Sequence, residues 1–152
     1  MSRFSLLALH ILLGWVFWLN TSYADPLMDE KIKSAITVDA ILYNGGVSTL
    51  LINKKSFLVV TGVSYITSSS PRAALNATRS AMLRANENFS RFVHGEQIKT
   101  NETLSDNNQH SLLESTQQSL STGYIPPIST IDNWLIEKDK RTIHVLYFPV
   151  TH

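Results

Sequence analysis

The sequence predicts an α+β protein: an antiparallel sheet of about four to five strands, with one long helix packed across it and an extra N-terminal helix. Two segments, residues 47–67 and 128–150, each show a strand, a turn and a second strand. Between them, residues 72–94 show the apolar spacing of a long helix. We expect the helices to cover one face of the sheet.

The first 24 residues have the layout of a secretory signal peptide. Arg3 supplies a positive charge, an apolar run covers residues 4–19, and a polar stretch ends in the small residues Ser22 and Ala24. We therefore predict that residues 1–24 are cleaved as a signal peptide and that the protein is periplasmic or secreted. The alternative is a leader retained as an inner-membrane anchor.

Residues 25–152 are predicted to form a single exported α+β domain of ordinary size. The sequence contains no cysteine, so neither a lipid anchor at the cleavage site nor a disulfide can form. We expect no membrane insertion after cleavage. Of 13 Lys and Arg, Arg3 leaves with the signal peptide, and 12 Asp and Glu balance the rest. This neutral charge argues against nucleic acid as a partner.

The N-terminal helix is predicted over residues 26–43, because its apolar residues follow helical spacing and Gly45 comes after its end. Ile, Thr and Val are common over 36–43, so a strand is the alternative there. The first hairpin follows this helix, with one strand predicted over residues 47–52 and the other over residues 57–67. Gly62, within the second strand, indicates a bulge or a close approach of another backbone.

The long helix is predicted over residues 72–94, with Ser70 as its N-cap, Pro71 at the first position and Gly95 after its end. Its expected inner stripe has small residues early and aromatic residues late. The stripe consists of Leu75, Thr78, Met82, Ala85, Phe89 and Phe92, with Ala74, Ala77 and Ala81 beside it.

The remaining segments are less uniform. A short polar strand is expected over residues 96–104, and the Ser/Gln-rich segment 105–122 fits a weak helix, a loop or an edge strand equally well. The second hairpin pairs residues 128–137 with 141–150. Apolar residues on both faces of its last strand indicate an interior position in the sheet or a contact between copies of the chain.

No catalytic residue, cofactor-binding residue or metal ligand is predicted. The sequence contains no H-x-x-x-H pair, no G-x-S-x-G turn and no phosphate-binding glycine motif. His94 is expected to stabilise the end of the long helix through the helix dipole. His144 is expected at the surface or on an edge of the sheet. We therefore predict that the chain is not an enzyme and takes no cofactor.

Aromatic residues in the last third of the chain are the candidate interaction surface. Tyr124, Trp134, Tyr147 and Phe148 would form a recognition surface if two or more point outward. The alternative is that Trp134 fills the core under the long helix.

Several segments from residue 57 onward form a further pattern: Leu58-Val-Val-Thr-Gly62, the helix from Ala73 to Phe92, Val93-His-Gly95-Glu, Ser121-Thr-Gly123-Tyr to Trp134, and Val145-Leu-Tyr-Phe-Pro149. In these segments the chain resembles a family of small bacterial envelope proteins, the group of the 20-kDa lipoprotein and of the N-terminal domain of the flagellar outer-membrane ring protein. The resemblance implies an exported envelope component without catalytic residues to carry over. The chain departs from the family in lacking the lipobox cysteine.

These observations predict a non-catalytic exported protein that binds other envelope proteins, within a secretion, conjugation or appendage apparatus. A homo-oligomer is compatible with the apolar faces of the last strand. The alternative is a small periplasmic enzyme or ligand-binding protein, with a site between the long helix and the Ser/Gln-rich segment that includes His110 or His144.

Overall fold

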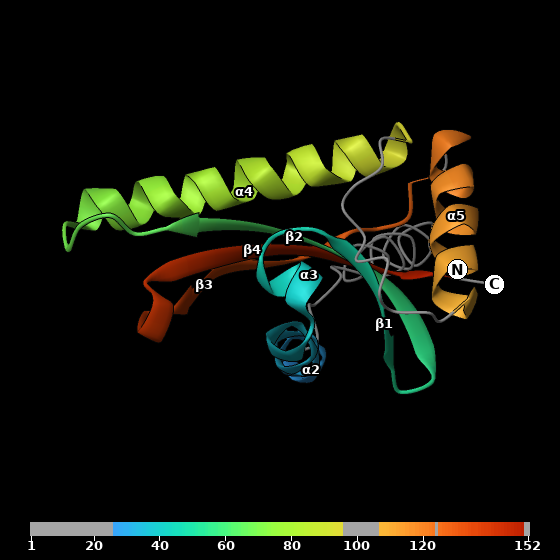
Figure 1. The fold of residues 1–152 in the computed structure, drawn as a ribbon, viewed down its shortest axis with the longest axis horizontal. Helices are drawn as coiled ribbons and strands as arrows, with labels where there is room; N and C mark the ends of the chain where they lie inside the picture. The colour runs from blue at the N-terminus through green and yellow to red at the C-terminus, as the bar shows by residue number, and fades with distance from the viewer. Residues whose placement is uncertain (1–25, 96–106, 124, 151–152) are drawn as a thin grey trace, which may run out of the picture.

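The computed structural model describes residues 26–95, 107–123 and 125–150. The predicted signal peptide and the short strand expected over 96–104 lie outside the described residues. In chain order (Figure 1), the elements are α2 (Pro26–Val38), α3 (Ala40–Tyr43), β1 (Val47–Ile52), β2 (Lys55–Tyr65), α4 (Pro71–Val93), α5 (Asn107–Ser121), β3 (Ser129–Ile136), a 3-10 turn (Glu137–Asp139) and β4 (Arg141–Val150).

The strands form one open antiparallel sheet in the order β1-β2-β4-β3, so the predicted α+β fold is confirmed. The two hairpins lie side by side because β2 pairs with β4 along ten residue pairs, from Ser56 with Val150 to Tyr65 with Arg141. β4 therefore lies in the interior of the sheet. This position explains why both of its faces are apolar.

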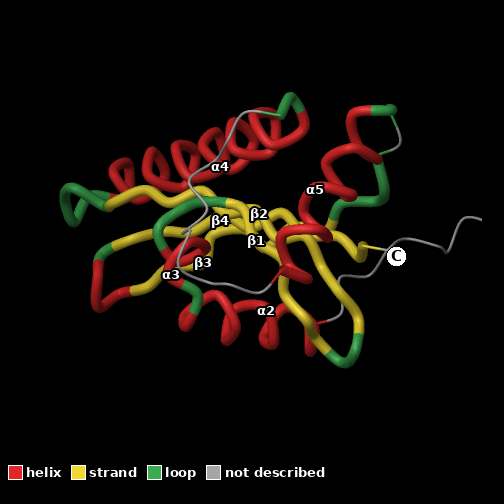
Figure 2. Tube along the Cα trace, turned by 45° about the vertical axis from the view of Figure 1, so that its right-hand side comes forward, coloured by secondary structure: helices red, strands yellow, loops and turns green. Residues whose placement is uncertain are grey.

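Helices cover both faces of the sheet, and the expectation that they cover one face is wrong. α2 and α3 pack on one face and α4 on the other (Figure 2). Residues 57–64 of β2 and 142–148 of β4 are all buried, so other elements must pack on both faces of the sheet at these strands. The first core contains Ile32, Ile36, Leu42, Val59, Val63, Ile143 and Val145, and the second contains Leu58, Val60, Ala85, Phe92, Leu146 and Phe148.

The N-terminal segment is helical, as predicted, but it forms two helices instead of one. The break falls at Asp39, whose backbone is extended and whose carboxylate accepts hydrogen bonds from the backbone N–H groups of Ile41 and Leu42. An aspartate side chain that bonds to the following backbone in this way is the usual N-cap of a new helix. The alternative of a strand over residues 36–43 is wrong.

The predicted start of the long helix is confirmed in detail. Ser70 is the N-cap of α4, its side chain accepts a hydrogen bond from the N–H of Ala73, and Pro71 occupies the first turn. At the other end His94 is the C-cap, and its Nδ1 lies 2.7 Å from the carbonyl oxygen of Ser90. Gly95 follows with φ of 77°. Glycine suits this left-handed conformation, which ends many helices.

The buried stripe of α4 differs in part from the predicted one, of which Ala85 and Phe92 are buried as expected. Ala77, Ala81 and Ala85 are buried, whereas Leu75 and Met82 are 49% and 41% exposed. The reason is the close approach that Gly62 was predicted to mark. A Cβ atom built on Gly62 would lie 2.1 Å from the carbonyl oxygen of Ala81, so the backbones of β2 and α4 nearly touch there. Only small side chains fit on the helix face at such a contact.

β1 begins at Val47, which pairs with Val60 of β2. β2 continues past this point, so its outer edge from Thr61 to Tyr65 has no partner strand among the described residues. Side chains of α4 bond to this edge instead. The Asn88 amide donates to the carbonyl oxygen of Thr61 at 2.9 Å, and the Arg84 guanidinium donates to that of Val63. These two side chains satisfy acceptors that a neighbouring strand would otherwise occupy.

The Ser/Gln-rich segment, for which three structures were open, is helical in its described part. Leu112, Thr116 and Leu120 are buried at helical spacing, and the Gln117 side chain donates to the carbonyl oxygen of Phe92 at the end of α4. Within the described ranges, no helix combines the length and the hydrophobicity needed to cross a membrane.

Candidate functional site

The four aromatic residues predicted to form an interaction surface do not share one. Tyr147 and Phe148 are only 4% and 2% exposed, and they point to opposite faces of β4. The Tyr147 hydroxyl donates to Asp29 of α2 at 2.7 Å, whereas Phe148 packs edge-to-face on Phe89 of α4. Both are therefore core residues.

Trp134 is half-buried, and it packs on the core under α2. The alternative that it fills the core under the long helix is therefore wrong, because α4 covers the other face. Tyr124 lies outside the described residues. The three described members, Trp134, Tyr147 and Phe148, therefore do not form the predicted aromatic surface.

A different exposed apolar surface borders α4. Leu75 and Met82 are seven residues apart and so lie on one flank of the helix. Phe89, seven residues further on, packs on Phe148 of β4, which shows that this flank faces β4 and the edge strand β3. Leu135 of β3 is 47% exposed. It pairs with Thr142, which is on the same face of β4 as Phe148. We call Leu75, Met82 and Leu135 the α4–β3 flank.

His144 lies on the α4 side of β4 and is buried, with 6% of its surface exposed, so the prediction of a surface or edge position is wrong. Its Nδ1 lies 3.0 Å from Oδ1 of Asp132 on β3. A bulge between Ile131 and Trp134 displaces the strand there, and Asn133 adopts φ of 56°. Burial lowers the pKa of His144, and the nearby Asp132 carboxylate opposes part of that effect.

The buried His144 should make the stability of the protein depend on pH. Its pKa in the folded protein is below the ordinary value of 6.5, so the unfolded chain binds the proton first on acidification. The free energy of unfolding should therefore fall below pH 6.5, by at most about 1.4 kcal/mol per pH unit. Urea unfolding of wild type and His144→Gln, on both sides of pH 6.5, measures this contribution. A stability difference between wild type and His144→Gln that does not change with pH would contradict this expectation.

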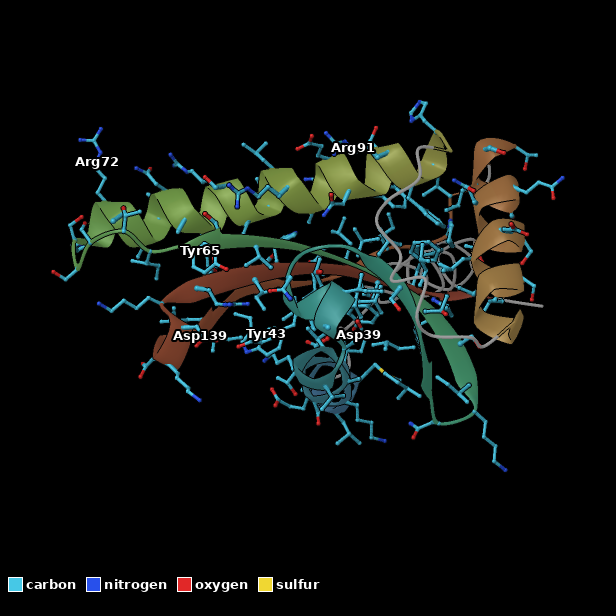
Figure 3. All side chains as sticks on the ribbon, in the orientation of Figure 1. Asp39, Tyr43, Tyr65, Arg72, Arg91 and Asp139 are labelled. Atoms are coloured by element: carbon cyan, nitrogen blue, oxygen red, sulfur yellow. The ribbon has the colours of Figure 1, made fainter. Side chains whose placement is uncertain are left out.

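A second polar cluster lies where β4 begins, on the α2 side of the sheet. The guanidinium of Arg141 lies 4.3 Å from the ring centre of Tyr43 and 5.3 Å from that of Tyr65, and its Nη1 donates to the Tyr43 carbonyl. The Tyr43 hydroxyl donates to Asp139. This hydrogen bond raises the pKa of Tyr43, with a smaller contribution from burial. Tyr43, Tyr65 and Asp139 are labelled in Figure 3 at the same end of the sheet. The cluster connects α3 to the β3–β4 turn.

Two open hollows lie near the connection from β2 to α4, each with a volume of about 360 Å³. The first lies along α4 and is lined mainly by Ser, Thr and Asn side chains. The second lies against the β3–β4 turn and is lined by Leu135, Glu137 and Lys140, among others. Neither hollow is lined by α5, where the alternative of a ligand site was expected. In the part of the chain that the structure describes, no three His, Asp or Glu residues are grouped so that they could hold a metal ion.

Comparison of the chain with protein-family models, with curated proteins and with solved structures finds no match. The class that the described residues define is an α+β protein with an open four-stranded antiparallel sheet. The resemblance to the small envelope proteins stays a prediction from the sequence.

Proposed function

We propose that the chain is a non-catalytic exported protein that binds other proteins of the bacterial envelope. The observation that carries this proposal is the α4–β3 flank. Three large apolar side chains, Leu75, Met82 and Leu135, are between 41% and 49% exposed on one side of the molecule. Grouped apolar exposure, as opposed to single scattered residues, is typical of surfaces that bind a partner.

The sequence of α4 supports a binding role for this flank over a packing role. A Leu or Met on a surface helix usually faces the core, but here the stripe of Ala77, Ala81 and Ala85 takes that place. The helix is thus held on the sheet by its small residues. Its larger apolar residues remain available to a partner.

Export supports envelope proteins as the partner class. The leader at residues 1–24 predicts the periplasm or the exterior, and the mature chain carries equal numbers of acidic and basic residues. A neutral protein with an apolar flank is suited to a protein partner, because it lacks the positive field that attracts nucleic acid or an anionic membrane. We propose that the apparatus concerned is one of secretion, conjugation or surface appendages.

The double variant Leu75→Ser with Met82→Ser should lose its partners while it stays folded. Both side chains are about half exposed, so the double change should cost little stability in comparison with a core substitution. The measurement is affinity purification of the exported protein from detergent-solubilised envelopes. Leu51→Ser on β1 is the matched control, because Leu51 is 74% exposed and lies outside the flank.

Partners that wild type and Leu51→Ser retain and that the double variant loses would support the proposal. Recovery of the wild-type protein alone and monomeric would contradict it, and so would equal retention of partners by all three proteins. The intact mass of the same preparation tests the leader prediction, since a mature N-terminus at Asp25 excludes a retained anchor.

A further inference from the structure

The strand β3 forms one edge of the sheet, and its outer side has no partner strand in the described part of the chain. The outer edge of β2 differs, because side chains of α4 bond to it. Within the described ranges, no side chain bonds to the backbone of β3 in the same way. The hydrogen-bonding groups on the outer side of β3 are therefore open to another chain.

The neighbouring strands show which backbone groups of β3 point outward. In β2, the N–H and C=O of Thr61 point to the outer edge of the sheet, away from β4. Because this direction alternates along a strand, the groups of His144 in β4 point toward β2 and those of Ile143 point toward β3. Ile143 pairs with Trp134. The next residue, Leu135, therefore directs both its N–H and its C=O away from the sheet.

The side chains around Leu135 are apolar on both faces of the sheet. Leu135 itself is 47% exposed, on the α4 side. Trp134 and Ile136 lie on the opposite side, where they are only partly buried against the core under α2. Apolar residues on both faces are typical of an interior strand, whereas an exposed edge usually carries lysine, proline or other residues that hinder pairing. The end of β3 thus has the composition of an interior strand at an edge position.

A second copy of the chain fits this edge by symmetry. In an antiparallel pair of β3 strands centred on Leu135, the two copies of Leu135 lie directly opposite and exchange both backbone hydrogen bonds. The same register sets Trp134 opposite Ile136 of the second copy, and pairs of an aromatic and a β-branched residue are favourable. It also brings the exposed Lys138 to the level of the exposed Asp132 of the second copy, so that opposite charges meet.

The bulge between Ile131 and Trp134 limits this pairing to the end of β3. Thr130 is the corresponding outward-pointing residue before the bulge. A pair centred on Thr130 would set residues 126–127 of the second copy, both proline, opposite the strand, and proline has no N–H to donate. The register around Leu135 is therefore favoured. Because it uses the same edge of both copies, the assembly closes as a dimer.

We propose that the chain forms a two-fold symmetric dimer through antiparallel pairing of β3 around Leu135, so that the sheets of the two copies join into one. The two α4 helices then lie on the same face of the joined sheet, and the two α4–β3 flanks adjoin above the paired strands. The inference deepens the proposed function, since the combined flank is the surface offered to envelope proteins. The dimer itself forms without any other protein.

Sedimentation equilibrium of the purified exported protein measures this dimer. The strand pairing is short, so we expect a dissociation constant on the order of micromolar. Leu135→Lys sets two like charges opposite each other at the two-fold axis, and it should raise this constant at least about tenfold. Leu51→Lys is the matched control, because it adds the same charge at a leucine that is 74% exposed on β1, the strand at the other edge of the sheet. It should dimerise as wild type does.

A mixture of two variants separates lost pairing from lost folding. Leu135→Lys and Leu135→Glu should each be monomeric alone, because like charges meet at the axis. An equimolar mixture should dimerise again, with one copy of each variant, because opposite charges then meet. Damage to the fold of either variant could not produce this recovery.

Three outcomes would overturn the proposal: a wild-type protein that stays monomeric up to about 1 mM, equal dimerisation of wild type and Leu135→Lys, or a mixture of the two charged variants that stays monomeric. A monomeric protein that still captures envelope partners would overturn this inference and leave the proposed function standing. A dimer that captures no partner would do the reverse.

Discussion

Replacing Gly62 by alanine should destabilise the protein by at least about 3 kcal/mol, the largest effect expected for a single methyl group in this chain. A Cβ atom at this position would lie 2.1 Å from the carbonyl oxygen of Ala81 and 2.2 Å from the backbone nitrogen of Ala85. Both contacts are with helix backbone, which cannot rotate away as a side chain does. The whole of α4 would have to move off the sheet.

Displacement of α4 would also break contacts that depend on its close packing against the sheet. Phe92 and Ala85 would separate from the core, and the Asn88 amide would lose the Thr61 carbonyl. Urea unfolding measures the cost. Gly123→Ala is the matched control, since a Cβ there meets nothing within 4 Å and only its φ of 97° is unfavourable. That control should cost about 1–2 kcal/mol. Equal stability of Gly62→Ala and wild type would refute the close packing.

Truncating Phe148 to alanine should cost about 3–5 kcal/mol, the usual range for a buried phenylalanine. The ring is 2% exposed and packs edge-to-face on Phe89, with the ring centres 6.2 Å apart. It occupies the core between the interior strand β4 and the helix, so its removal leaves a cavity that rigid backbone on both sides cannot fill. This expectation is opposite to that of an exposed binding residue, whose truncation would leave stability nearly unchanged.

Thermal and urea unfolding of Phe148→Ala, Phe89→Ala and the double variant measure this contribution. Phe89 is only partly buried, so its own truncation should cost less. The coupling between the two rings should be about 0.5–1.5 kcal/mol, as for other aromatic pairs. A stability loss below about 1 kcal/mol for Phe148→Ala would show that the ring is not part of the core.

Local signals in the sequence predicted the elements well, because capping and turn residues act over a few positions. Ser70 and Pro71 located the start of α4, and the apolar residues on both faces of β4 indicated its interior position. The break at Asp39 was missed, although aspartate is a known N-cap. Spacing alone does not show whether such a side chain turns back to its own backbone.

Tertiary packing determined the features that the spacing of apolar residues in the sequence could not predict. Leu75 and Met82 are more apolar than Ala77 and Ala81, so the predicted stripe of α4 was centred on them. The close approach at Gly62 reversed this preference, because only small side chains fit there. The prediction for His144 was wrong although both faces of β4 are apolar, because a histidine is usually not expected in a strand that is buried on both faces.

The candidate surfaces illustrate a similar limit. Successive residues of a strand point to opposite faces of the sheet, so Tyr147 and Phe148 could not lie on one shared aromatic surface.

The hydrogen bonds from Arg84 and Asn88 to the outer edge of β2 also restrict how the sheet can grow. An incoming strand would need the carbonyl oxygens of Thr61 and Val63, which these two side chains already occupy. This stretch of β2 is therefore closed to edge-to-edge aggregation with another chain. Protection of this kind matters in a chain without cysteine, because no disulfide can hold the edge of its sheet in place.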